Sequence, residues 1–192
     1  MNKNYALLTL FLYSFTFAQD GAPASPYYNG FDWTLTGNNL KTQLSTKITS
    51  THTNTLTYSE AEKALQIVDL DPTDASETNV LLVYGFSNNL CPSNSSDDND
   101  HRRRNKESDG GGATCQWNRE HVYAKSLGTP NLGETGPGAD AHHLRASDVQ
   151  RNGNRGSQKF SEGSGNSGNI SGGWYPGDEW KGDVARSMMY MY

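Results

Sequence analysis

The chain has 192 residues, a length that suits one domain with a sizeable buried core. Only 33% of the residues are hydrophobic and 20 are glycine, so we expect a loop-rich α+β protein. The formal net charge of -5 argues against a protein that binds nucleic acid through bulk electrostatics. From residue 101 to 160, however, ten Lys/Arg outnumber six Asp/Glu, so the acidic surplus lies elsewhere.

The first residues have the features of a secretory signal peptide. Lys3 supplies a positive charge, residues 5–17 form an apolar run, and Ala18 is a small residue suited to cleavage. The run is too short for a comfortable membrane span, and no later segment is apolar enough to cross a bilayer. We therefore expect residues 1–18 to be removed and residues 19–192 to form one exported domain. Its two cysteines favour a disulfide between Cys91 and Cys115 over two free thiols.

Two amphipathic helices and a strand are expected before residue 90. Leu40, Leu44 and Ile48 recur every four residues and predict the first helix. Ser59 with Glu62 three positions later indicates the start of the second helix, which Asp71-Pro72 ends. The continuous apolar run from residue 80 to 86 predicts a buried strand.

A polar segment from residue 93 to 112 is predicted to be a loop, and it carries four basic residues in a row from His101 to Arg104. Two interpretations stay open for this charge run. It is either a solvated face, or one of its arginines reaches the functional site and neutralises a phosphate. Near the end of the chain, Val184, Met188 and Met191 predict a helix from Asp178 onward. That helix shows no stop signal before Tyr192, so we expect the natural domain to continue beyond it.

The stretch from Cys115 to Phe160 has the highest density of residues that carry chemistry. It contains three of the five histidines, together with acidic, basic and amide side chains: Glu120, His121, Asp140, His142, His143, Arg145, Asn152 and Arg155. Such side chains can accept a proton, hold a hard metal ion and bind an anion. We interpret this stretch as an active site.

The local structure of this stretch is predicted to be strand, irregular loop, strand, helix. Residues 115–123 and 141–146 have strand character, and Ser147 with Gln150 forms a capping box that starts a helix. Asn152, Arg155 and Lys159 would share one face of that helix. Because adjacent residues of a strand face opposite sides, the Arg119 to His121 triplet is best placed at a strand end.

A carboxylate, an amide and a histidine in one cleft suit one-metal phosphodiester chemistry. Carboxylate and amide oxygens are ligands for Mg²⁺ or Ca²⁺, a neutral histidine is a general base, and nearby arginines stabilise a pentacovalent phosphate. The stretch WNREHVYAKSLG followed by DAHHLRASDVQRNGNRG resembles the bacterial endonuclease I family, which includes secreted ribonucleases and belongs to the ββα-metal (His-Me finger) nucleases. This resemblance implies a ββα-metal core with additional helices and long loops.

The resemblance also implies a role for each matching residue. His121 falls on the general base, and Glu120 and Asn152 fall on the metal ligands; the metal would be one Mg²⁺, with Ca²⁺ or Mn²⁺ possible. For the arginine that contacts the phosphate the candidates are Arg102 and Arg104, and Arg145 is a further catalytic candidate. Supporting roles are expected for the remaining polar residues: Arg119, Asp140, His142 and Arg155.

Two rival functions are kept open. A zinc hydrolase would use His121, His142 and His143 as ligands, but it gives Glu120 and Asn152 no purpose. A secreted, non-catalytic binding module would hold calcium at residues 97–100, although that loop lacks the EF-hand spacing. For the nuclease we expect a monomer without membrane association, acting in the periplasm or outside the cell. It would cut DNA, RNA or both with little sequence specificity, because phosphate contacts carry no base code.

Overall fold

The computed structural model describes residues 26–87 and 101–192, and the chain divides after His52 into two units that are taken separately. The first unit contains α1 (Gly37–Thr51), which confirms the first predicted helix; none of its residues is buried. The predicted signal peptide, the predicted calcium loop at residues 97–100 and Cys91 lie outside the described residues. The Cys91–Cys115 disulfide and the assignment of residues 19–192 to one domain therefore stay predictions.

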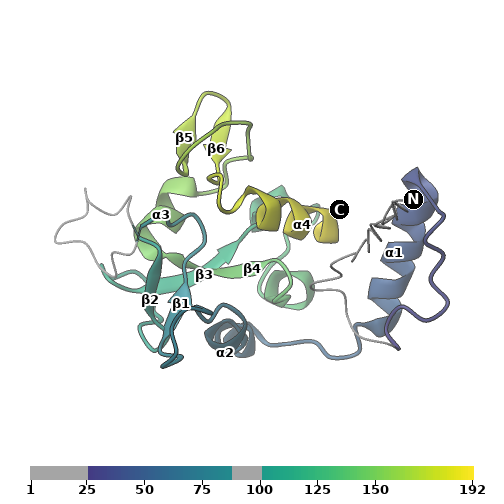
Figure 1. Ribbon diagram of the computed structural model, residues 1–192, viewed down its shortest axis with the longest axis horizontal. Helices are drawn as coiled ribbons and strands as arrows, with labels where there is room; N and C mark the ends of the chain where they lie inside the picture. The colour runs from purple at the N-terminus through teal and green to yellow at the C-terminus, as the bar shows by residue number, and fades with distance from the viewer. Residues whose placement is uncertain (1–25, 88–100) are drawn as a thin grey trace, which may run out of the picture. The chain divides into compact units, whose positions relative to one another are not determined.

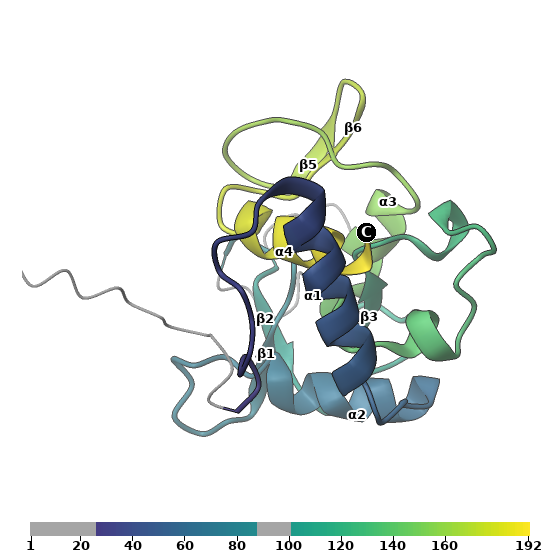
Figure 2. The same cartoon turned by 90° about the vertical axis from the view of Figure 1, so that its right-hand side faces the viewer.

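A two-stranded hairpin between two helices is the centre of the second unit (Figures 1 and 2). Strand β3 (Trp117–His121) pairs antiparallel with β4 (Leu144–Asp148), with Trp117 opposite Asp148 and His121 opposite Leu144. Helix α2 (Tyr58–Val68) packs on one face of the hairpin and α3 (Val149–Arg155) packs on the other. Side chains of β3 alternate between these faces, so the two helices meet different residues of the same strand.

The start of α2 differs from the prediction by two residues. Thr57, not Ser59, is the N-cap: its hydroxyl accepts from the Glu60 amide and the Glu60 carboxylate accepts from the Thr57 amide. With this start, the buried face of α2 carries Ala61 and Leu65. These two residues join the first core cluster, whose other members are Val80, Leu82, Trp117, Leu144 and Ala146.

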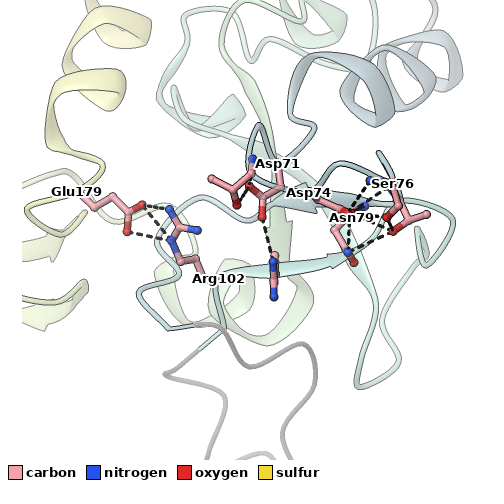
Figure 3. Close-up of polar contacts among 9 residues, drawn as sticks. Asp71, Asp74, Ser76, Asn79, Arg102 and Glu179 are labelled. Carbon is pink, nitrogen blue, oxygen red and sulfur yellow. Dashed lines mark hydrogen bonds and ion pairs between the residues drawn. The ribbon is translucent and has the colours of Figure 1, made fainter.

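The apolar run from residue 80 to 86 is buried as predicted, but the strand prediction is wrong beyond Leu81. Strand β1 (Asn79–Leu81) ends there, and Tyr84 has a φ of 73°, which a strand does not allow. The partner of β1 is β2 (Arg103–Asn105), in a segment predicted to be a loop. The turn before β1 is organised by Asp74, whose carboxylate accepts from Ser76 and Asn79 (Figure 3).

Helix α3 also begins one residue later than predicted. Asp148, not Ser147, is the N-cap, and its Oδ1 accepts from the amides of Gln150 and Arg151 at 2.9 and 3.0 Å. Ser147 is paired in β4, opposite Asn118, and the helix begins only after Asp148, the last residue of that strand. The helix ends at Arg155, so Lys159 does not extend its face. The strand before it is shifted too, since β4 starts at Leu144 and both His142 and His143 lie in a turn.

The last part of the chain contributes three residues to a second core cluster. After β5 (Gly168–Ile170) and β6 (Gly173–Tyr175), helix α4 (Lys181–Met191) confirms the predicted terminal helix (Figure 1). The cluster joins six residues from distant segments: Val83, Tyr84, Val122, Trp174, Trp180 and Val184. Two short 3₁₀ helices, at Lys125–Leu127 and Gly136–Ala139, belong to the loop between β3 and β4. Within residues 26–87 and 101–192, no helix has the length and apolar character to span a membrane.

Candidate active site

A pocket of about 390 Å³ opens where β3 ends and α3 passes over it. Its lining residues come from β3, from the loop after it and from α3. They are Arg119, Glu120, His121, Ala124, Lys125, Ser126, Asn131, Asn152, Gly153, Arg155, Gly156 and Ser157. The pocket therefore unites the predicted base, His121, with both predicted metal ligands, Glu120 and Asn152.

Glu120 is a buried carboxylate of which the described residues engage only one oxygen. The Tyr84 hydroxyl donates to its Oε1 at 2.7 Å and the Arg155 Nη1 lies 3.0 Å from the same oxygen. Oε2 has no hydrogen-bond partner among the residues that the structure describes. Burial raises the pKa of Glu120 to about 7, against the lowering effect of Arg155 and Tyr84. A further cation at Oε2 would favour the ionised form.

His121 is held as a neutral base with a defined tautomer. Its Nε2 lies 2.9 Å from the Gly138 carbonyl oxygen. Because a carbonyl only accepts, Nε2 carries the proton and Nδ1 keeps its lone pair. Burial lowers the pKa of His121 to about 4, so the ring is uncharged at neutral pH. Tyr58 of α2 stacks on the ring with centroids 5.8 Å apart.

The side-chain amide of Asn152 forms its hydrogen bonds through its nitrogen atom. Its Nδ2 donates to Asn118 Oδ1 at 2.7 Å and to the Arg119 carbonyl at 3.3 Å. These two bonds fix the orientation of the amide, and Oδ1 has no hydrogen-bond partner in the described part of the chain. An oxygen ligand is therefore available on α3 beside the carboxylate on β3.

Arg155 joins α3 to the end of β3. Its Nη1 and Nη2 donate to the main-chain carbonyls of His121 and Val122, each at 2.9 Å, and the same guanidinium neutralises Glu120. The side chain is only 2% exposed. It is thus a structural cation that fixes the strand end.

The two arginines predicted to contact the phosphate, Arg102 and Arg104, do not line the pocket, and neither does the further catalytic candidate Arg145. Arg102 forms an ion pair with Glu179, with Nη2 at 2.7 Å from Oε1 (Figure 3). Arg104 is buried against Asp148, and its Nη1 lies 2.7 Å from Asp148 Oδ2. Arg145, on β4, has its Nη1 at 3.6 Å from Asp69 Oδ1. Of the charge run, Arg104 and His101 are therefore interior rather than solvated.

Asp140 and His142 support the turn that carries Gly138. His142 Nδ1 lies 2.7 Å from Asp140 Oδ1, and the Tyr190 hydroxyl donates to Asp140 Oδ2 at 2.8 Å. His143 contacts the Pro137 carbonyl at 2.7 Å through Nε2. In the described ranges, no three His, Cys, Asp or Glu side chains are placed to hold a metal ion together. The geometry thus gives the three-histidine zinc site no support.

Four residues of the site had no individual role in the sequence interpretation: Tyr84, Asn118, Lys125 and Gly138. Tyr84 was hidden in an apolar run, and Gly138 acts through its backbone, which leaves no signature in side-chain chemistry. Asn118 directly precedes the Arg119–His121 triplet, and its polar side chain could have been predicted as a hydrogen-bond partner for Asn152. Lys125 is half-buried, lines the pocket and pairs with Glu134 at 3.2 Å, a partner that is largely exposed. Arg119 also lines the pocket. Its guanidinium lies over the Tyr58 ring, and its Nη1 donates to the Tyr58 main-chain carbonyl at 2.6 Å.

The donor set fits a hard divalent cation. Glu120 Oε2 and Asn152 Oδ1 are oxygens without another partner, and a buried carboxylate with a raised pKa favours a nearby positive charge. With only two protein ligands, a Mg²⁺ ion would keep most of its coordinated waters, as this ion commonly does.

The chain thus combines an α+β fold with a basic pocket that contains a histidine, a carboxylate and an amide. The model of the Endonuclease I family matches residues 36–192, and the chain belongs to that family. It is 40% identical over 182 residues to an extracellular ribonuclease of Bacillus subtilis (strain 168), covering 88% of this chain and 56% of the relative. It is also 40% identical over 162 residues to an extracellular ribonuclease of Bacillus amyloliquefaciens, covering 81% and 48%. The chain spans about half the length of these curated relatives, and no solved structure matches it significantly.

Proposed function

We propose that this chain is a secreted, metal-dependent endonuclease that hydrolyses phosphodiester bonds of RNA, DNA or both with little sequence specificity. One observation carries the proposal: Glu120, His121 and Asn152 line one pocket, and each keeps one nitrogen or oxygen without a hydrogen-bond partner in the described residues. Family membership and the extracellular ribonucleases among the relatives support the same reaction class and the export.

We interpret β3, β4 and α3 as the ββα-metal core of this nuclease. The hairpin is followed by the helix without an intervening loop, because Asp148 ends β4 and caps α3. This connection brings Asn152 over Glu120. A bound Mg²⁺ would be held by Glu120 and Asn152 and would neutralise charge on the phosphate and on the leaving oxygen.

His121 would supply the proton transfer. Its Nδ1 takes a proton from a water molecule, whose oxygen attacks phosphorus while the bond from phosphorus to the 3′ oxygen breaks. The departing 3′ oxygen takes a proton from a solvent water molecule, and His121 releases its proton to solvent, so the products are a 3′ hydroxyl and a 5′ phosphate. Because water is the nucleophile, no 2′ hydroxyl is required and one site can serve RNA and DNA.

Lys125 is the cation that we place nearest to the substrate phosphate. It lines the pocket and its partner Glu134 is largely exposed, so exchange of that partner for a phosphate costs little. Arg102 and Arg104 stay predictions for the same role, and Arg145 stays a prediction as a further catalytic residue. The side chains of Arg102 and Arg145 are 27% and 29% exposed, whereas Arg104 is 2% exposed and buried against Asp148.

Parallel degradation assays on RNA and DNA test this function. The purified protein should degrade both polymers with Mg²⁺, lose activity in EDTA and regain it when Mg²⁺ is restored. His121→Ala should abolish cleavage while the variant still folds and binds nucleic acid, and His52→Ala on an exposed residue is the control. Cleavage by His121→Ala at more than a small fraction of the wild-type rate would exclude His121 as the base. Rescue by Zn²⁺ alone would favour the rival zinc hydrolase.

A further inference from the structure

A second and larger pocket, of about 840 Å³, lies next to the catalytic pocket. Its walls are mainly apolar and include aromatic side chains from three separate segments, Tyr123, Phe160 and Tyr175. Leu127 and Met188 add aliphatic surface between them. No step of the proposed hydrolysis uses this space.

Arg155 is the wall that the two pockets share. The polar edge of its guanidinium donates to the His121 and Val122 carbonyls, whereas its flat face lies over the Phe160 ring at 4.8 Å. Val122 and Tyr123, which line the larger pocket, directly follow His121 in the chain. The apolar space therefore begins where the catalytic pocket ends.

The rim of the larger pocket is charged in a way that suits a polyanion. Lys159 is exposed, and its side-chain amine has neither a hydrogen bond nor an ion pair among the described residues. Lys181 forms an ion pair with an exposed carboxylate, Asp178, at 2.7 Å. Glu162 also lines the pocket and offers a carboxylate to an amino group. A flat, largely apolar ring that is attached to a phosphodiester backbone and carries amino groups meets all of these features.

We propose that the larger pocket receives an unstacked nucleobase beside the scissile phosphate and makes the enzyme prefer single-stranded nucleic acid. The inference rests on the proposed function, because the adjacent pocket must hold the phosphate. Stacking on an aromatic side chain is available to every base, so the pocket adds affinity without a sequence code. A base that is paired and stacked within a duplex cannot enter it without first leaving the helix.

Binding of a fluorescent single-stranded oligonucleotide in EDTA tests the inference without any need for cleavage. Anisotropy should give a Kd for the intact strand and for versions in which one position at a time is abasic. For the wild-type protein, abasic positions in one part of the strand should weaken binding about tenfold. A duplex of the same sequence should bind more weakly than the single strand.

Leu127→Asp places a charge in the pocket wall at a residue that is already 37% exposed, and Ile67→Asp makes the same change at a 70% exposed position outside both pockets. Leu127→Asp should reduce the difference between intact and abasic strands to less than about twofold, whereas Ile67→Asp should keep the wild-type difference. Thermal unfolding of both variants checks that they fold.

Two outcomes separate the inference from the function on which it rests. If the protein cleaves RNA or DNA but binds intact and abasic strands with equal Kd values, the nucleobase pocket is overturned. The proposed nuclease function is then unaffected. An abasic effect that Leu127→Asp removes, in a protein that never cleaves, supports the pocket and overturns the proposed hydrolysis.

Discussion

The main-chain carbonyl of Gly138 accepts the Nε2 proton of His121 at 2.9 Å and thereby determines which nitrogen of the ring is basic. Gly138 has no space for a side chain, because a Cβ at this position would lie 2.1 Å from the Gly133 carbonyl oxygen. The position of the base therefore depends on a loop residue whose own side chain is a hydrogen atom.

Replacing Gly138 with alanine should displace this carbonyl and weaken catalysis. We expect kcat to fall on the order of ten- to a hundredfold, because small misplacements of a catalytic group have effects of this size. The control is Gly111→Ala, since a Cβ there meets nothing within 4 Å. Steady-state kinetics on a defined oligonucleotide measures the effect. A Gly138→Ala enzyme with wild-type kcat would show that the His121–Gly138 bond is not needed.

Tyr84→Phe should weaken both the fold and the metal site. The lost hydroxyl leaves Oε1 of Glu120 with only Arg155 as a partner, at a stability cost of about 1–2 kcal/mol. It also removes one group that lowers the pKa of Glu120, so more Mg²⁺ should be needed at pH 7. Urea unfolding and a Mg²⁺ titration of activity provide the two measurements. Tyr28→Phe is the matched control, because Tyr28 lines neither pocket and its hydroxyl has no hydrogen bond among the described residues. Identical Mg²⁺ curves for both variants would count against Glu120 as a ligand.

Asn152→Asp should change the metal dependence of the enzyme. A carboxylate cannot donate to Asn118 Oδ1 or to the Arg119 carbonyl, so the side chain loses its orientation while its affinity for a hard cation rises. We expect a shifted Mg²⁺ titration together with a lower kcat. Asn154→Asp adds the same charge to α3 at an exposed position and should leave the titration unchanged. Superimposable curves for wild type and Asn152→Asp would argue against ligation by Asn152.

Asp69 gives the fold a specific dependence on pH. Its Oδ2 accepts from the Ala146 amide at 2.7 Å, yet burial raises its pKa to about 6 against the attraction of Arg145. Between the unfolded pKa near 4 and the folded pKa near 6, the folded protein binds more protons than the unfolded chain. The free energy of unfolding should therefore fall by about 3 kcal/mol as the pH rises through this window, as far as this one group is concerned.

Asp69→Asn should remove that loss of stability. Between pH 4 and pH 7, the free energy of unfolding of the variant, measured in urea, should therefore rise relative to that of the wild type. Asp74→Asn is a control of opposite sign (Figure 3). Hydrogen bonds, that from Ser76 foremost, hold the pKa of Asp74 below its usual range, so this substitution should lower stability at pH 7. Parallel pH profiles of wild type and Asp69→Asn would contradict the role of Asp69.

The helices α1 to α4 and the central hairpin could be predicted from the sequence, but their boundaries could not, and strand β2 lies in a segment that was predicted to be a loop. Two capping motifs overlap at the start of α2, Thr57 with Glu60 and Ser59 with Glu62, and packing of Ala61 and Leu65 on the hairpin decides between them. The run from residue 80 to 86 shows burial, and burial alone does not define a strand. Tyr84 leaves the extended conformation at the point where its hydroxyl meets Glu120.

The arginine assignments show a second limit of the sequence. Charge identifies which side chains are able to bind a phosphate, but not which of them the fold uses internally. Asp148 engages Arg104 with one oxygen while its other oxygen caps α3. Lys125 was not predicted as a site residue, because a single lysine in a loop resembles any exposed lysine.

Helix α3 has only seven residues, fewer than an isolated helix needs to persist in water. Its ends are fastened by the Asp148 carboxylate at one side and by the bonds of Arg155 to the His121 and Val122 carbonyls at the other. The helix and the last residues of β3 should therefore open together, as one cooperative unit in amide hydrogen exchange. Any fluctuation that frees α3 would move Asn152 away from Glu120 at the same moment, so a single opening event would separate the two proposed metal ligands.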